Sequence, residues 1–108
     1  MNERSGLPFS VSRCQHRALG QLVVLQLAED FVLKLTYAEA SSLSFALVAV
    51  RDGLSCEREI YMSPIASDAA FAGSVQDLGM SIAMPAGVLE LDWLHVGFLA
   101  ESLACVIG

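Results

Sequence analysis

The chain has little charge, and the charge that it has is mostly acidic. Of its 108 residues 17% are charged, with 12 Asp and Glu against six Lys and Arg, so the net charge is −6. A usual domain has about 25% charged residues. All six basic side chains precede Glu59, and the remainder of the chain holds six acids and no Lys or Arg. Nucleic acid and anionic lipid need a basic surface, so we expect neither as a partner.

Familiar catalytic and cofactor motifs are missing as well. The sequence has no G-x-G-x-x-G, G-x-x-x-x-G-K-[ST], H-E-x-x-H or G-x-S-x-G, which removes the commonest nucleotide, zinc-protease and serine-hydrolase sites. Cys14, Cys56 and Cys105 form no C-x-x-C pair, so a zinc ribbon or thioredoxin motif is also absent. We predict reduced thiols in a cytoplasmic protein, with no catalytic residues, metal or cofactor.

No apolar run reaches the ~18 residues that a membrane-spanning helix needs. Residues 18–28 follow Arg13 and Arg17 and faintly resemble a signal peptide, but two glutamines interrupt the run and Glu29 and Asp30 follow it directly. We therefore expect a soluble protein without membrane contact.

Hydrophobic residues make up 55% of the chain, which excludes intrinsic disorder. The length is that of about one domain, residues 1–108. A domain of this size buries only roughly two thirds of its unfolded surface, so part of the apolar excess should stay exposed. Large exposed apolar patches usually mark interfaces. The composition therefore predicts a homo-oligomer or a protein partner.

The densest apolar stretch, residues 20–50, decides the fold. Residues 20–37 fit a helix, since Asp30 and Lys34 would form an i,i+4 pair. They also fit two strands with residues 28–30 as the turn, because apolar and polar side chains alternate on both sides of it. The strands expected on either side favour the hairpin.

Other segments carry strand signals. We expect an edge strand at 9–13, a hairpin of residues 43–50 and 54–62 around Asp52-Gly53, strands at 80–84 and 88–96, and a strand or short helix at 98–107. Residues 1–8 are predicted to be a flexible lead-in and 63–79 a long loop, with a helical turn near 68–72. The spacing predicts an all-β antiparallel sandwich or barrel of seven to eight strands. The alternative is an α+β fold with one long helix, about 17–39, packed on an antiparallel sheet.

Few side chains suggest chemistry. Cys14 and His16 could join Asp92 and His95 around a zinc ion, but an isolated C-x-H is a weak signal for a tetrahedral site. Cys56 could act as a nucleophile with His95 as base and Asp92 as orienter. Residues three apart point to opposite faces of a strand, so a strand at 88–96 would separate Asp92 from His95.

Two carboxylate pairs, Glu57 with Glu59 and Glu90 with Asp92, share strand faces. Such pairs can perform acid–base work, but we interpret them as the solvated face of a half-buried sheet. Trp93 is expected in the core, and if exposed it would resemble an interface anchor.

The sequence therefore predicts a non-catalytic, β-rich protein–protein interaction or assembly domain that self-associates. One alternative is a small-molecule-binding β-domain, or a minor enzyme, with a pocket near His95 and Cys56. A second is an acidic inhibitor or mimic that docks through residues 59–108 on a basic partner surface, with binding that weakens in salt.

Overall fold

A computed structural model describes residues 7–108, so the first six residues of the predicted lead-in 1–8 lie outside the described residues. Seven strands and two helices follow one another in that range: β1 (Ser10–His16), β2 (Gly20–Ala28), β3 (Phe31–Thr36), α1 (Tyr37–Arg51), β4 (Glu59–Met62), β5 (Phe71–Gln76), β6 (Gly79–Met84), β7 (Gly87–Asp92) and α2 (Trp93–Ile107).

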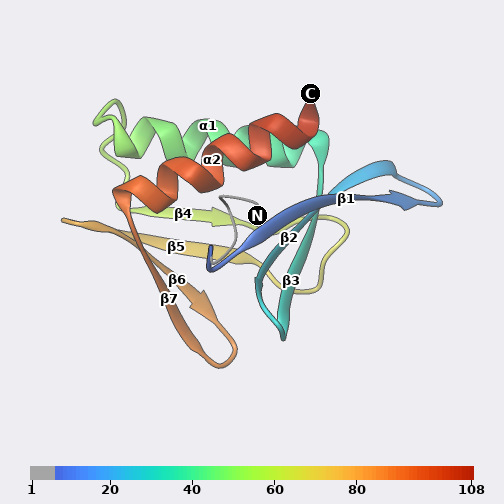
Figure 1. Cartoon of the computed structure of the whole chain (residues 1–108), viewed down its shortest axis with the longest axis horizontal. Helices are drawn as coiled ribbons and strands as arrows, with labels where there is room; N and C mark the ends of the chain where they lie inside the picture. Colours follow the sequence, from blue (N-terminus) through green and yellow to red (C-terminus); the bar gives the residue numbers. More distant parts are fainter. Residues whose placement is uncertain (1–6) are drawn as a thin grey trace.

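The strands form two antiparallel sheets, ordered β1-β2-β3 and β4-β5-β6-β7. Helix α1 connects the sheets, and α2 follows the last strand. Both helices lie side by side above the sheets (Figure 1). The fold is therefore α+β, with helices packed on antiparallel sheets. The predicted all-β sandwich or barrel is wrong, whereas the helix-on-sheet arrangement of the alternative is confirmed.

The hairpin of β2 and β3 confirms the strand interpretation of residues 20–37. Leu25 pairs with Leu33 and Val23 with Leu35, and all four side chains are fully buried. Along β3 the buried side chains alternate with exposed or partly buried ones. A helix over 17–39 would have spread these apolar side chains around its circumference, so that part of the alternative prediction is wrong.

The predicted strand at 43–50 is helix α1. Thr36 caps its first turn by accepting from the Glu39 amide, and the Glu39 carboxylate accepts in return from the Thr36 amide. This capping box satisfies two backbone donors that a helix start leaves unpaired. The buried residues Ala40, Leu43, Ser44, Leu47 and Val50 recur at helical spacing.

The expected hairpin around Asp52-Gly53 is therefore wrong. Asp52 is the C-cap of α1, and Gly53 takes a φ of 74° just beyond it. Left-handed glycines commonly end helices in this way. The turn signal was correct, but it ends a helix rather than joining two strands, and only the last four residues of 54–62 form a strand, β4.

Two further boundaries differ from the predictions. Strand β5 (Phe71–Gln76) occupies part of the predicted loop 63–79, and it includes the last two residues of the helical turn expected at 68–72, where no helix forms. Strand β7 ends at Asp92, where the predicted strand 88–96 changes into α2. The edge strand near residues 9–13 and the strand at 80–84 are confirmed as β1 and β6.

One buried apolar cluster contacts both sheets and both helices. At the helix crossing the Ser44 hydroxyl donates to the Ala100 carbonyl at 2.8 Å, and the Arg51 side chain lies against Gly97. Small residues at these positions let the helices approach closely. Within residues 7–108, neither helix is long and apolar enough to cross a membrane.

Candidate functional site

The four-stranded sheet packs one face on the helices and leaves the other face uncovered. Its inward side chains belong to the apolar cluster: Ile60, Phe71, Met80, Ile82 and Leu91. Side chains alternate along a strand, so the intervening residues point outward. The outward face is therefore where the sheet can meet another molecule.

The register sorts the outward side chains into two rows. Tyr61 pairs with Ala72 and Ala83 with Val88, while Gly73 opposite Ile82 places Ala72 beside Ala83. This apolar row runs Tyr61, Ala72, Ala83, Val88. Two residues further along each strand, the pairing gives a polar row of Glu59, Ser74, Ser81 and Glu90.

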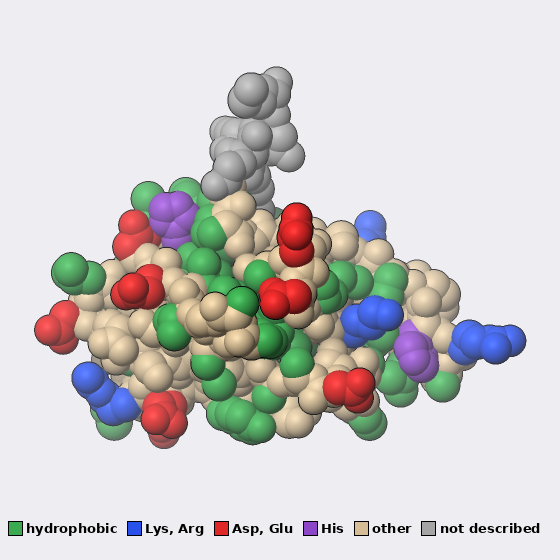
Figure 2. All heavy atoms as spheres, turned by 90° about the horizontal axis from the view of Figure 1, so that it is seen from below, with side chains coloured by type: hydrophobic (Ala, Val, Ile, Leu, Met, Phe, Trp, Pro, Cys, Tyr) green, Lys and Arg blue, Asp and Glu red, His purple; other side chains and the backbone are tan. Residues whose placement is uncertain are grey.

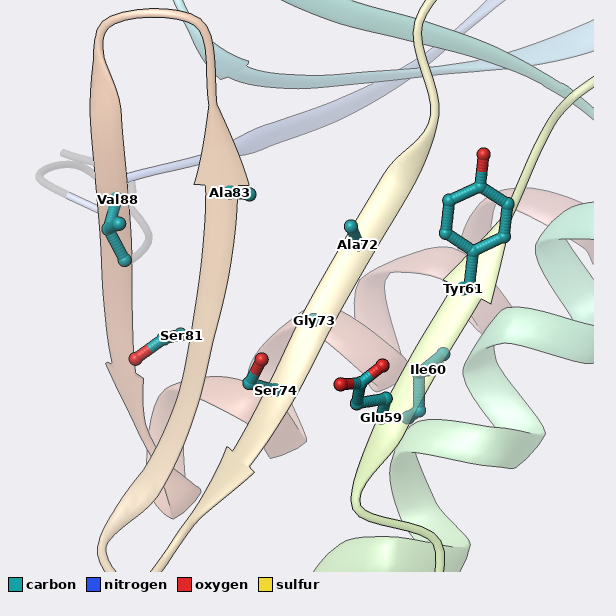
Figure 3. Close-up of a pocket in the computed structure, with 9 residues that line it drawn as sticks. All are labelled: Glu59, Ile60, Tyr61, Ala72, Gly73, Ser74, Ser81, Ala83 and Val88. Atoms are coloured by element: carbon teal, nitrogen blue, oxygen red, sulfur yellow. The ribbon is translucent and has the colours of Figure 1, made fainter.

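Side-chain size turns this face into a trough. The two central strands, β5 and β6, contribute only small residues, whereas the edge strands β4 and β7 contribute larger ones (Figure 3). The resulting hollow measures about 270 Å³. It is lined by Glu59, Ile60, Tyr61, Ala72, Gly73, Ser74, Ser81, Ala83 and Val88. We call this hollow, together with Glu90 at its β7 edge, the sheet-face trough.

The trough is bordered by negative charge. Glu59 and Glu90 are exposed at opposite edges of the polar row, and Figure 3 shows the Glu59 side chain reaching from β4 towards Ser74. None of the four strands contains Lys or Arg. Arg58 is exposed in the bend that precedes β4, outside the four strands. Viewed from the side opposite the helices, hydrophobic side chains lie among acidic ones, and Lys or Arg side chains are visible towards the ends of this face (Figure 2).

The structure joins Asp92 to His95, contrary to the expectation that a strand would separate them. Because β7 ends at Asp92, its carboxylate caps α2 and accepts from the His95 amide at 2.8 Å. The same oxygen lies 2.7 Å from the His95 Nδ1 atom. The bond from the His95 amide, followed by that from its ring, holds the pKa of Asp92 below its usual value.

The other proposed ligands lie elsewhere. His16 accepts from the amides of Ala18 and Leu19 through Nδ1, at 3.1 and 3.0 Å, and so orders the β1–β2 turn. Cys14 belongs to β1, in the other sheet, and Cys56 is exposed beyond α1. Within the described part of the chain, no three His, Cys, Asp or Glu side chains are grouped to hold a metal ion.

The cysteine–histidine hypothesis fares similarly. Across residues 7–108 no hydrogen bond links Cys56 to His95, whose ring instead meets Phe98 edge-on with centroids 5.8 Å apart. Neither residue lines the sheet-face trough or a second hollow of about 270 Å³ between β1 and α2. The contacts of Asp92 and His95 are those of a helix cap.

The predicted carboxylate pairs are redistributed. Glu59 and Glu90 face the trough from different strands, with Ser74 and Ser81 between them. Glu57 precedes β4, and Asp92 serves as the cap of α2. Trp93 packs against the core as expected, and its Nε1 donates to the Asp77 carbonyl at 3.0 Å.

Sequence reasoning missed the small residues that form the trough's floor. Ala72 and Ser74 alternate with inward residues of β5, as Ser81 and Ala83 do in β6. This alternation was visible in the sequence, but the β5 half of it lay within a segment assigned as loop.

Comparison with known proteins gives no relative: no family model matches the chain, and no curated protein or solved structure does.

Proposed function

We propose that this chain is a non-catalytic protein–protein interaction domain that self-associates through the outward side of α1 and α2. The observation that carries the proposal is a group of large apolar side chains on nearly uncharged helices. Phe45 is 79% exposed on α1, and Leu94 and Phe98 are 63% and 36% exposed on α2. Exposed apolar groups of this kind commonly mark interfaces.

The helices carry little charge that would oppose pairing. Each has 15 residues, and together they contain only Glu39, Arg51 and Glu101 as charged side chains. Glu39 takes part in the capping box, and Arg51 forms an ion pair with Asp52 at 2.9 Å. A two-fold dimer places the same surface opposite itself, so a nearly neutral surface avoids like-charge repulsion.

The remaining outward residues are mainly small, including the exposed Ala38, Ser41, Ser42 and Ala104. Two helices of 15 residues are each about 22 Å long and pack about 10 Å apart. Their flat footprint is therefore roughly 450 Å², below the ~800 Å² per partner of a standard interface. We expect a dimer that dissociates on dilution.

The sheets are less suited to symmetric pairing. A trough placed opposite its own copy would bring Glu59 and Glu90 near their equivalents, without any basic residue on the same strands to offset them. The β3 edge is covered in part by Ser67, which bonds to the backbone of Lys34. Both features support the helical surface as the site of self-association.

The test is sedimentation velocity over a dilution series. Phe45→Asp introduces a charge at a position that is already exposed, so the monomer should stay folded while the dimer is lost. Leu78→Asp is the matched control, because Leu78 is 83% exposed in the β5–β6 turn, outside the helices. A wild-type chain that remains monomeric at all concentrations, or equal effects of the two variants, would contradict the proposal.

We further propose a single domain, located in the cytoplasm, that binds neither nucleic acid nor membranes. The apolar cluster shared by both sheets and both helices supports one domain. Cys14, Cys56 and Cys105 are all unpaired thiols, which fits a reducing compartment. The acidic strands β4–β7 disfavour phosphate-rich partners. Mild proteolysis and sizing of the full chain would test the single domain.

A further inference from the structure

We infer that the sheet-face trough binds a basic, amphipathic α-helix from a partner protein. This binding site lies on the face of the molecule opposite the helices, so it does not depend on the proposed self-association. The inference rests on three properties of the trough: its width, its two rows of side chains and its charge.

The trough has the dimensions of a helix. Its walls stand on β4 and β7, which are three strand spacings or about 14 Å apart. An α-helix with its side chains is about 10–12 Å across. Ala72, Gly73 and Ala83 on the floor project little or no side chain, so a helix can lie close to the sheet. Strands β5, β6 and β7 have six residues each, about 20 Å, and β4 has four, about 13 Å. These lengths match a helical segment of about 9–13 residues.

The two rows define which side chains the helix should present. Tyr61 and Val88 are 71% and 61% exposed at opposite ends of the apolar row, so Leu- or Ala-sized groups fit between them. The polar row lies about 7 Å further along the strands, close to the 5.4 Å pitch of a helix. A Lys or Arg three or four positions from the apolar residue would therefore reach Glu59 or Glu90.

Charge complementarity selects a basic occupant. Both wall carboxylates are exposed, and β4–β7 carry no Lys or Arg to neutralise them. Ser74 and Ser81 between the walls can donate or accept hydrogen bonds. A second copy of this trough would repeat the same negative charges, and an acidic peptide would add to them. A cationic helix removes the repulsion, while its Lys stems can pack over the apolar floor.

The probe is a synthetic helical peptide of about 16 residues built from Leu, Ala and Lys. Each Leu lies three or four positions from a Lys, so that both types share one face. One comparison peptide has the same composition in scrambled order, and the other has Glu in place of every Lys. Binding is measured by fluorescence anisotropy at low salt, using the Phe45→Asp chain so that self-association does not affect the result.

We expect the Lys peptide to bind and the other two to bind at least about tenfold more weakly. Glu59→Gln and Glu90→Gln should each weaken binding about two- to fivefold, the range of exposed ion pairs. Glu29→Gln, an equal charge change in the β2–β3 turn, should leave it unchanged. Salt at about 0.5 M should abolish the difference between Lys and Glu peptides through screening.

Ala83→Leu tests the shape of the trough without changing charge. Ala83 is exposed on β6, so a larger side chain should fill the floor, leave the fold intact by circular dichroism and reduce peptide binding about tenfold or more. The inference would be overturned if the Glu peptide bound as tightly as the Lys peptide. It would also be overturned if Ala83→Leu and Glu59→Gln both bound the Lys peptide as tightly as the parent chain does. If Ala83→Leu instead changes the sedimentation of the wild-type chain, the trough is occupied by a second copy, which would also overturn it.

Discussion

A serine in the segment between β4 and β5 closes one position of the β3 edge of the three-stranded sheet, and its removal should open that edge. The Lys34 amide of β3 donates to the Ser67 hydroxyl oxygen at 2.6 Å, and this hydroxyl donates in turn to the Lys34 carbonyl at 3.1 Å. The nearby Ile65 amide donates to the Glu39 carboxylate at 3.0 Å. One side chain thus replaces a neighbouring strand at a single position of β3.

Ser67→Ala removes both bonds of the hydroxyl and leaves the Lys34 backbone to water. A net intramolecular hydrogen bond contributes about 0.5–1.5 kcal/mol, and these two lie at an exposed edge where water can replace them. We therefore expect a total loss of about 1 kcal/mol. With a urea m-value of about 1–3 kcal/mol/M, the unfolding midpoint should fall by roughly 0.3–1 M.

Hydrogen exchange measured by NMR locates the effect. The Lys34 amide should lose most of its protection in Ser67→Ala, because Ser67 is its partner. The Leu35 amide points to the other side of β3, towards β2, since successive residues of a strand alternate, and it should change only with global stability. Ser63→Ala is the control, an equal change at an exposed serine of the same segment.

Unchanged Lys34 exchange in Ser67→Ala would refute the edge-closing role, as would an equal change in Ser63→Ala. The result also bears on self-association. An opened β3 offers backbone groups to a second chain, so Ser67→Ala should increase association by a route that Phe45→Asp does not block.

Three further predictions concern stability. Gly79→Ala should destabilise the fold by at least about 1–3 kcal/mol, because a Cβ there would collide with the Leu91 carbonyl of β7. Gly73→Ala should cost less, because the atom nearest to its added Cβ is the flexible end of Met80. Urea unfolding of both variants compares the two costs. Thr36→Ala removes the side-chain half of the capping box and should cost about 1 kcal/mol, measured in the same way. The pKa of Asp92 is lowered in the fold, so its cap contributes stability above the ordinary pKa of about 3.9 and loses it as pH falls through the lowered value. In that acid range the His95 amide should lose its protection from hydrogen exchange. Asp92→Asn should abolish this pH dependence.

The parts of the fold that the sequence predicted are those in which local patterning and tertiary burial agree. In β2 and β3 the alternation of apolar residues matches the faces that the sheet buries and exposes. The turn between them was correctly placed even without glycine. Here a period of two is sufficient, because the helices cover only one side of the sheet (Figure 1).

Helix α1 was missed because its apolar residues surround most of its circumference. Leu43 and Leu47 face the core, but Phe45 between them points outward and Val48, which follows, is only partly buried. This continuous run is compatible with a buried strand as well as a helix. The local signal that distinguishes the two is the T-x-x-E pattern from Thr36 to Glu39, because a capping box marks a helix start. The strand prediction did not take it into account.

The trough could not be derived from the sequence because it depends on how four strands are aligned. Glu59 and Glu90 are 31 positions apart, and only the pairings through Ser74 and Ser81 place them on one row. Conversely, the sequence allowed Cys56 and His95 to act as a pair, but no hydrogen bond joins them in the part of the chain that the structure describes. Nothing in the spacing of such residues shows whether the fold brings them together.

The two proposed surfaces have a joint consequence, because they lie on opposite sides of the molecule. If the helices pair, the sheet-face troughs of the two copies point away from each other, and one dimer offers two sites for basic helices. A partner with two such helices on a linker long enough to reach both sites would then bind with avidity, since its second helix binds at an effective concentration set by the linker. Phe45→Asp should therefore weaken the binding of a two-helix peptide while leaving the single-helix peptide unaffected. Equal affinities of the dimeric and monomeric chains for the two-helix peptide would show that the two surfaces do not act together.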